Sequence, residues 1–201
     1  MTTSDTPTPI VIKDTTANPA PIGLLGFGMT TILLNLHNAG FYGMSAMILG
    51  MGIFVGGLAQ VLAGYLEWKK NNTFGATAFT MYGMFWLSLV VIVVLPKTSF
   101  GATLAVDGPT MGWYLALWGL FTLMMFIGTL RLICILKVIF LSLTVLFFLL
   151  AIGKFWPNES LEHFTGYEGI FCGLSAFYAG VASVINEVHG KDILPTGAKK
   201  S

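Results

Sequence analysis

Charged residues are scarce in this sequence. Lys, Arg, Asp and Glu together make up 9% of the 201 residues, whereas hydrophobic residues make up 55%. An ordinary soluble domain has about 25% charged residues. A water-soluble globule of this length has too little interior to hide so much apolar surface. The composition therefore excludes a soluble protein and indicates a protein whose solvent is lipid.

Other features that are missing exclude further classes. The net charge is only +1, which gives no bulk attraction for nucleic acid. The chain has no HxxxH, HExxH or CxxC spacing and neither a GxSxG nor an SxxK motif, so we expect no metal, no cofactor and no enzyme activity. Its two cysteines, Cys134 and Cys172, are predicted to lie near opposite membrane faces. A disulfide needs Cα atoms within about 7 Å, so we expect free thiols.

Six apolar runs are long enough to be membrane helices. A bilayer core about 30 Å thick needs about 20 apolar residues per helix. Turn-forming residues such as Pro96 and Pro157 separate the runs, which lie at residues 21–36, 45–66, 76–95, 110–130, 134–153 and 167–186. The sequence therefore predicts an all-α, multi-pass membrane protein with six transmembrane helices per protomer.

The basic residues predict its orientation. Six spans place both chain ends on one side, and cytoplasmic loops carry an excess of Lys and Arg. Eight basic residues fall on the side of the termini and two, Lys97 and Lys154, on the other. The eight are Lys13, Lys69, Lys70, Arg131, Lys137, Lys191, Lys199 and Lys200. We therefore expect both termini in the cytoplasm and a location in the cell (inner) membrane.

The chain divides into three parts. Residues 1–17 are polar and rich in Thr and Pro, without the basic and apolar regions of a secretory signal, and are predicted to be a disordered tail. Residues 18–190 form the six-helix transmembrane domain, and residues 191–201 form a cytoplasmic C-terminal tail.

Acidic residues are expected only at the ends of spans. Glu67, Glu168 and Glu187 fall at predicted helix ends, and His163 falls in a predicted solvated outer loop. Charged groups in mid-membrane commonly mark ion or proton paths, so their absence argues against a pump with a carboxylate relay. Neutral polar residues do fall inside the spans. Asn35 and Gln60 are costly to bury and either find partners or face a polar pathway.

Glycine and proline mark helix packing and helix starts. Spans two and six contain Gly52-x-x-x-Gly56 and Gly169-x-x-x-Gly173, a spacing that favours close helix contact. The segment around Asn18, Pro19 and Pro21 is a predicted helix start, because proline is tolerated in the first turn. It is interpreted as a plain cap or as a first turn whose N–H groups attract an anion. Gly23, Gly26 and Gly28 then allow close neighbours.

These patterns indicate a pore or carrier for something small, and longer strings indicate a family. NPAPIGLLGFGMTTILLNLHNAG (18–40) resembles the signature of the acetate uptake transporter family, the bacterial succinate–acetate permease type, with Ile22 in place of the usual Leu. GGLAQVLAGYLEWKKNNTFGATAFTMYGMFWLSL (56–89), LWGLFTLMMFIGTL (117–130) and FLSLTVLFFLLAIG (140–153) resemble it too. The resemblance runs from residue 18 to residue 195 and leaves the N-terminal tail outside.

The resemblance implies a hexamer in the lipid bilayer, with a pathway in each protomer for acetate, succinate and other short carboxylates, accompanied by protons. It implies a constriction of Phe27 from GFG, Tyr82 from FTxYG and Leu143 from SLT, with Ala176 of GxSAxY helping to set the size limit. Apolar side chains there exclude hydrated ions. Further pathway residues are hypothesised near the constriction: Thr30, Thr31, Asn35, Gln60 and Thr80.

Two alternatives stay open from the residues alone. One is a membrane sensor or scaffold that moves nothing, which would display a signalling surface on tails or loops. The other is a pore for another small solute such as ammonium, which favours paired histidines deep in the membrane. His37 has no such partner evident in the sequence.

Overall fold

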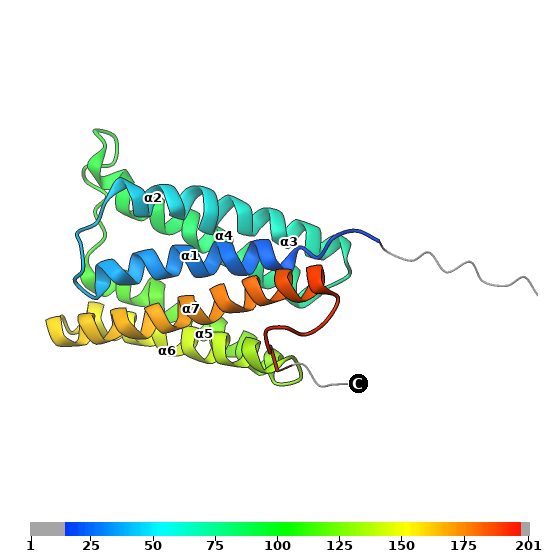
Figure 1. The fold of residues 1–201 in the computed structure, drawn as a ribbon. Helices are drawn as coiled ribbons and strands as arrows, with labels where there is room; N and C mark the ends of the chain where they lie inside the picture. Colours follow the sequence, from blue (N-terminus) through cyan, green and yellow to red (C-terminus); the bar gives the residue numbers. More distant parts are fainter. Residues whose placement is uncertain (1–14, 198–201) are drawn as a thin grey trace, which may run out of the picture.

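The computed structural model describes residues 15–197, and within this range the chain is helical without strands. Six helical stretches are long and apolar enough to cross a membrane (Figure 1). The second consists of three consecutive helices and the third ends in a short 3₁₀ turn. The elements are α1 (Ala20–Asn38), α2 (Ala46–Ile53), η1 (Phe54–Ala59), α3 (Gln60–Lys69), α4 (Thr73–Val94), η2 (Leu95–Lys97), α5 (Gly108–Thr129), α6 (Cys134–Phe155) and α7 (Glu159–His189). The predicted number of spans is confirmed.

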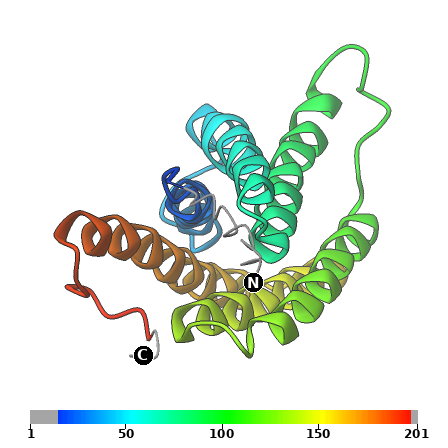
Figure 2. The same cartoon turned by 90° about the vertical axis from the view of Figure 1, so that its right-hand side faces the viewer.

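The helices run alternately up and down the bundle. α1 packs along α7, α3 along α4 and α5 along α6, and α6 also packs against α7. In the end-on view of Figure 2 the long connection between α4 and α5 projects away from the bundle. α1 begins and α7 ends at the same end, which we call the terminal end (Figure 1). The other end is called the opposite end.

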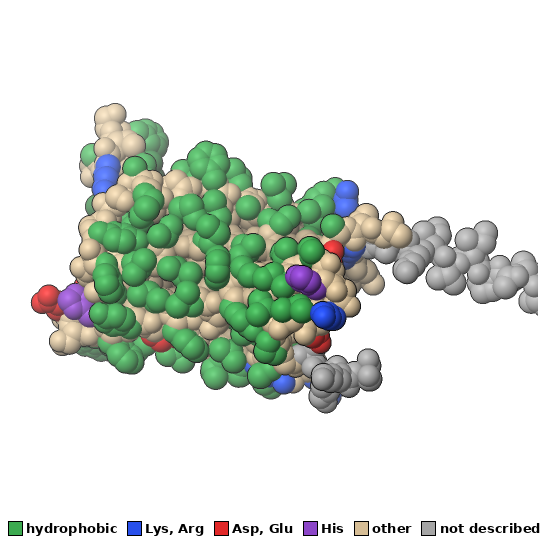
Figure 3. Space-filling view, viewed as in Figure 1, with side chains coloured by type: hydrophobic (Ala, Val, Ile, Leu, Met, Phe, Trp, Pro, Cys, Tyr) green, Lys and Arg blue, Asp and Glu red, His purple; other side chains and the backbone are tan. Residues whose placement is uncertain are grey.

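Hydrophobic side chains cover the flank of the bundle between these two ends. Figure 3 shows this apolar surface, with basic and histidine side chains gathered at its two ends. Large exposed hydrophobic residues include Phe54, Leu62, Leu117 and Phe171. Exposed apolar side chains of this kind are stable in hydrocarbon, where the backbone polar groups are satisfied within the helices. The surface is that of a multi-pass membrane protein.

Asn and Asp side chains accept first-turn N–H groups at four helix starts. Asn18 Oδ1 accepts from the Ala20 N–H at 3.0 Å, so the predicted start of the first span is confirmed. Asn72 and Asn158 accept the N–H of the residue three positions later, at 3.1 and 3.0 Å. Asp107 does the same with Thr110 at 2.8 Å, and these bonds lower the pKa of its carboxyl. Each cap satisfies a first-turn donor that has no partner within the helix.

Glycine lets α1 and α7 approach closely. A Cβ on Gly28 would lie 2.6 Å from the Phe177 nitrogen, and one on Gly173 would lie 2.9 Å from the Ile32 nitrogen. A Cβ on Gly169 would collide with the Asn35 side chain. The tight packing predicted from the glycine spacing in the sixth span is therefore confirmed.

The sixth span begins earlier than predicted, at Glu159 instead of near residue 167. The polar residues Glu159, Glu162 and His163 suggested a solvated loop, but they form the first turns of α7. Asn158 caps this start, and Glu159 and Glu162 lie in the first turn, where their negative charges interact favourably with the positive end of the helix dipole. The loop prediction for His163 is therefore wrong.

The C-terminal segment folds back onto the bundle. The N–H groups of Cys134 and Ile135 donate to the carbonyls of Gly197 and Thr196, so this segment satisfies the start of α6. Asn186 bonds the backbone of residues 193 and 194. The predicted tails lie partly outside the described residues, which exclude 1–14 and 198–201. Both cysteines are free, Cys172 in the interior and Cys134 at the surface.

Candidate functional site

Two cavities enter the bundle from its two ends. The terminal-end cavity has a volume of about 220 Å³ and is lined mainly by α1, α4 and α6. The opposite-end cavity has a volume of about 450 Å³ and is lined by later turns of α1 and α4, by the last turns of α6, and also by α2, α5 and the first turns of α7. Because the same helices line both cavities at different depths, the two cavities face each other through the middle of the bundle.

The three predicted constriction residues come together at the inner part of the terminal-end cavity. Phe27, Tyr82 and Leu143 come from α1, α4 and α6, all three line this cavity, and their exposed fractions are 6%, 3% and 3%. The ring centroids of Phe27 and Tyr82 lie 6.0 Å apart. Side chains from three helices that are distant in sequence therefore form one apolar floor.

An aromatic layer continues from this floor toward the other cavity. Phe85 and Trp86, one turn beyond Tyr82 on α4, line the opposite-end cavity. Phe85 packs edge-on against Phe147 of α6, with ring centroids 5.1 Å apart. Phe140 of α6 lies against Tyr82 at 6.0 Å. The layer closes the space between the cavities with apolar rings instead of charges.

The Tyr82 hydroxyl is held in place inside the core. It donates to Thr122 Oγ1 at 2.9 Å, and the Thr122 hydroxyl donates to the Trp118 carbonyl at 2.7 Å. A hydroxyl that donates its proton in this way keeps lone pairs to accept a second bond. The site can therefore present an acceptor for a carboxylic acid O–H at the apolar floor.

The terminal-end cavity also has polar walls. Gln60 lines it and is only 1% exposed, and its Oε1 has no hydrogen-bond partner among the described residues. Glu67 and Asn72 line its outer part and are joined by a bond of 2.7 Å from Asn72 Nδ2. A buried amide oxygen without a protein partner is costly unless a ligand or water donates a hydrogen bond to it. Gln60 is therefore the polar group best placed to meet a solute.

The predicted helix-start motif lies at the mouth of this cavity. Asn18 and Ala20 line it, while Pro19 and Pro21 are buried and Gly23 packs against Phe79. The N–H groups of Ala20 and Ile22 are already bonded, to Asn18 Oδ1 and the Pro19 carbonyl. This segment is a plain helix start, because the Ala20 and Ile22 N–H groups already have hydrogen-bond partners within the chain.

The remaining predicted pathway residues lie elsewhere. Thr30 donates to the Gly26 carbonyl at 2.8 Å, and Asn35 donates to the Thr31 carbonyl at 2.9 Å. Thr80 is half-buried against Gly64 of α3. Five of the predicted residues are absent from the linings of both cavities: Thr30, Thr31, Asn35, Thr80 and Ala176. Their roles in a pathway stay predictions.

The opposite-end cavity has a polar mouth. His37, Lys154, Asn158 and Glu162 line it. His37 Nδ1 bonds the Tyr42 carbonyl at 2.9 Å, which leaves the other ring nitrogen available. Lys154 brings one positive charge to this mouth and Glu162 one negative charge. Within residues 15–197 no group of three or more His, Cys, Asp or Glu side chains is arranged to hold a metal.

One acidic residue lies well within a membrane-spanning helix, against expectation. Glu168 was expected at a helix end, but it lies nine residues into α7 and accepts a bond from Ser142 Oγ at 2.5 Å. The signal that places it there is Asn158, whose cap starts α7 early. The expectation that acidic residues lie only at span ends is therefore wrong.

Comparisons with known proteins agree with this architecture. The profile of the GPR1/FUN34/yaaH family matches residues 3–194, which extends the likeness into the N-terminal segment. The succinate-acetate/proton symporter SatP of Escherichia coli K12 is 56% identical over 181 residues, 90% of this chain and 95% of SatP. The solved structure of the bacterial acetate channel SatP has a TM-score of 0.88 at 55% identity and covers 90% of this chain and 99% of its own.

A more distant relative has a different name. Ammonia transport outward protein 2 of Saccharomyces cerevisiae is 35% identical over 176 residues, which cover 84% of this chain and 61% of the yeast protein.

Proposed function

This chain belongs to the GPR1/FUN34/yaaH family, and we propose that it is a membrane transporter or channel for acetate and other short-chain carboxylates, succinate among them. The relatives named for SatP support this proposal, one as a succinate-acetate/proton symporter and the other as an acetate channel. The proposal includes movement of protons with the solute. A sensor or scaffold has no comparable support.

The observation that carries the proposal is the meeting of Phe27, Tyr82 and Leu143 on the floor of one cavity that faces a second cavity. A narrow apolar neck between two wider vestibules that have polar residues at their mouths is the arrangement that gates by size and by dewetting. We assign the pathway through each protomer to these two cavities and the neck between them. The pathway narrows where the three side chains meet.

The chemistry of the neck suits acetate. A methyl group packs against Phe27 and Leu143, while the carboxyl group meets the Gln60 amide and the Tyr82 hydroxyl. A hydrated inorganic ion gains nothing from apolar rings and must lose its water, so the neck rejects it. Acetic acid crosses more easily than acetate because its carboxyl group is neutral, which links passage to protons.

The orientation and assembly complete the proposal. Five described basic residues lie at the terminal end, against Lys97 and Lys154 at the other. The terminal end therefore faces the cytoplasm of the cell membrane. Lys154 lies at the external mouth. The protomers assemble as a hexamer in the bilayer, and each carries its own pathway. The five basic residues at the terminal end are Lys69, Lys70, Arg131, Lys137 and Lys191.

Ammonium is the second candidate solute, because the yeast relative carries an ammonia-transport name. His37 lies at the mouth of the opposite-end cavity and bonds a backbone carbonyl, and no second histidine lines either cavity. The apolar neck packs against a methyl group, which acetic acid has and ammonium lacks, and this contact favours the carboxylic acid.

The decisive experiment is uptake of radiolabelled acetate into liposomes that hold the purified protein. We expect uptake above that of empty liposomes, competition by succinate but not by ammonium, and acceleration by an inward proton gradient. Uptake without any effect of the gradient supports a simple channel. Absence of uptake by folded, assembled protein would refute carboxylate transport, and labelled methylammonium then tests the second candidate.

A further inference from the structure

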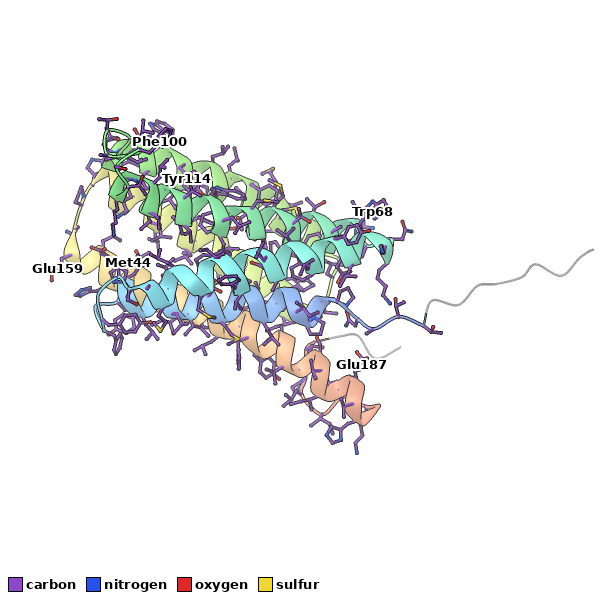
Figure 4. The ribbon with its side chains drawn as sticks, turned by 90° about the horizontal axis from the view of Figure 1, so that it is seen from above. Met44, Trp68, Phe100, Tyr114, Glu159 and Glu187 are labelled. Carbon is purple, nitrogen blue, oxygen red and sulfur yellow. The ribbon has the colours of Figure 1, made fainter. Side chains whose placement is uncertain are left out.

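Glu168 is a half-buried carboxyl group on a membrane-spanning helix, and its Oε2 atom is fully buried. Figure 4 labels Glu159 and Glu187, which lie at the two ends of α7, and Glu168 lies between them. Its partner Ser142 stands eight residues after the start of α6, about 12 Å along a helix about 33 Å long. Glu168 is therefore placed inside the membrane-spanning part of the bundle, about a third of the way along α6 from the terminal end and at the depth of Leu143.

No described cation neutralises this carboxyl group. Ser142 Oγ donates to Oε1, and Oε2 is buried without a hydrogen-bond partner. α7 packs against α1 and α6, and no ion pair joins Glu168 to either helix. On its own helix, Tyr167 precedes Glu168 and is exposed, and the buried thiol of Cys172 lies one turn further on and donates weakly to the Ile139 carbonyl. The other titratable groups of α1 and α6 are His37, Cys134, Lys137 and Lys154.

A carboxylate in hydrocarbon without a cation is costly, so such residues mark sites where a proton or an ion binds. Because no cation of the described chain pairs with it, the proton remains as its partner. We propose that Glu168 is a membrane-embedded proton-binding site that controls passage at the Leu143 constriction through its hydrogen bond to Ser142. The step is uptake of one proton by the carboxylate and its later release, and only an O–H bond forms or breaks.

Ser142 and Leu143 link this site to the constriction, because they are adjacent residues that point from α6 to different neighbours. Leu143 lines the terminal-end cavity, and Ser142 bonds α7. A hydrogen bond to a carboxylate is roughly twice as strong as one to a neutral acceptor. Protonation of Glu168 therefore weakens the bond that ties α6 to α7 and frees α6 to move Leu143 away from Phe27. Deprotonation restores the bond and holds the constriction closed.

The inference rests on the proposed carboxylate transport, and two readouts separate the two ideas. The first is acetate uptake by proteoliposomes with equal pH on both sides, corrected for empty liposomes and compared at acidic and neutral pH. Glu168→Gln resembles the protonated acid, and Ser142→Ala removes the bond. Both are expected to raise the uptake rate at neutral pH by about tenfold, the difference between a charge-assisted and a neutral bond. Glu187→Gln, on the same helix but exposed, is the matched control and should behave as wild type.

The second readout needs no transport. Infrared difference spectra between acidic and neutral pH should show a carboxylic acid band that disappears in Glu168→Gln and persists in Glu187→Gln. If Glu168→Gln does not fold, the uptake test uses Ser142→Ala. The infrared test then uses the shift of the carboxylic acid band in Glu168→Asp. A folded Glu168→Gln protein with the wild-type pH dependence of uptake overturns the control of passage. An infrared band unchanged by that substitution overturns the proton site. Wild-type protein that moves no acetate defeats the proposed function alone.

Discussion

Replacing Gly28 with Ala should force α1 and α7 apart. A Cβ at this position would lie 2.6 Å from the Phe177 nitrogen and 2.8 Å from the Gly173 carbonyl oxygen. Both atoms belong to the backbone of α7 and cannot rotate away. Ordinary van der Waals contact begins at 3.4 Å, so the helices must separate locally by about 0.8 Å, which is 3.4 Å minus 2.6 Å.

The cost follows from packing. Overpacking a well-packed interior by a methyl-sized group costs about 1–3 kcal/mol, and a contact with rigid backbone belongs at the upper end. Alanine returns up to about 1 kcal/mol of helix propensity. We therefore expect Gly28→Ala to lower the free energy of unfolding by about 2 kcal/mol.

Gly50 of α2 provides the control, because a Cβ there meets no atom within 4 Å. Gly50→Ala should be neutral or stabilising by up to about 1 kcal/mol. The two variants should then differ by about 3 kcal/mol, roughly a hundredfold in the unfolding equilibrium constant. Reversible unfolding in detergent or lipid measures this difference. Equal stability of Gly28→Ala and Gly50→Ala would show that α1 and α7 do not pack as described.

Three further predictions concern transport. Leu143→Ala should widen the neck and raise succinate uptake relative to acetate by about tenfold at equal protein density; an unchanged ratio would remove Leu143 from the filter. Gln60→Leu keeps the bulk but removes the amide, so KM for acetate should rise about tenfold, and unaltered acetate kinetics would mean that Gln60 does not meet the solute. Lys154→Gln should slow acetate uptake at low ionic strength only, since salt screens the attraction between the Lys154 charge and the approaching anion. Lys97→Gln, exposed but away from the cavity lining, is its control, and a loss equal in both variants or persistent in high salt would exclude steering by Lys154.

The number and order of the spans could be predicted from the sequence because apolar runs and turn residues alternate clearly. The first, second, fourth and fifth spans began within two residues of the predicted positions, and Asn18 marked the first correctly. α7 was the exception. Its first turns carry Glu159, Glu162 and His163, whose polarity resembles a loop, and only the cap by Asn158 shows that a helix has begun.

The constriction could not be predicted from pattern alone. Phe, Tyr and Leu in a membrane helix ordinarily pack in the core or face lipid, and only the family resemblance singled out Phe27, Tyr82 and Leu143. Closeness in sequence to Phe27 or Tyr82 also gave a wrong expectation of which polar residues line the cavities. Asn35 follows Phe27 by two helical turns, but Gly169 of α7 packs against its side chain and covers it. Which helix covers a given face depends on tertiary packing, which one sequence does not show.

The arrangement of α6 explains how one helix can serve both selection and control. Leu143 and Phe140 line the terminal-end cavity, whereas Ser142 turns to α7 and bonds Glu168. Neighbouring residues on a helix point about 100° apart, so a single turn of α6 lines the terminal-end cavity on one face and meets the Glu168 carboxyl group on another. A change in the bond at Ser142 therefore acts on Leu143 through one rigid turn of helix. Selection by the apolar neck and control by a proton then need no charged group at the constriction itself.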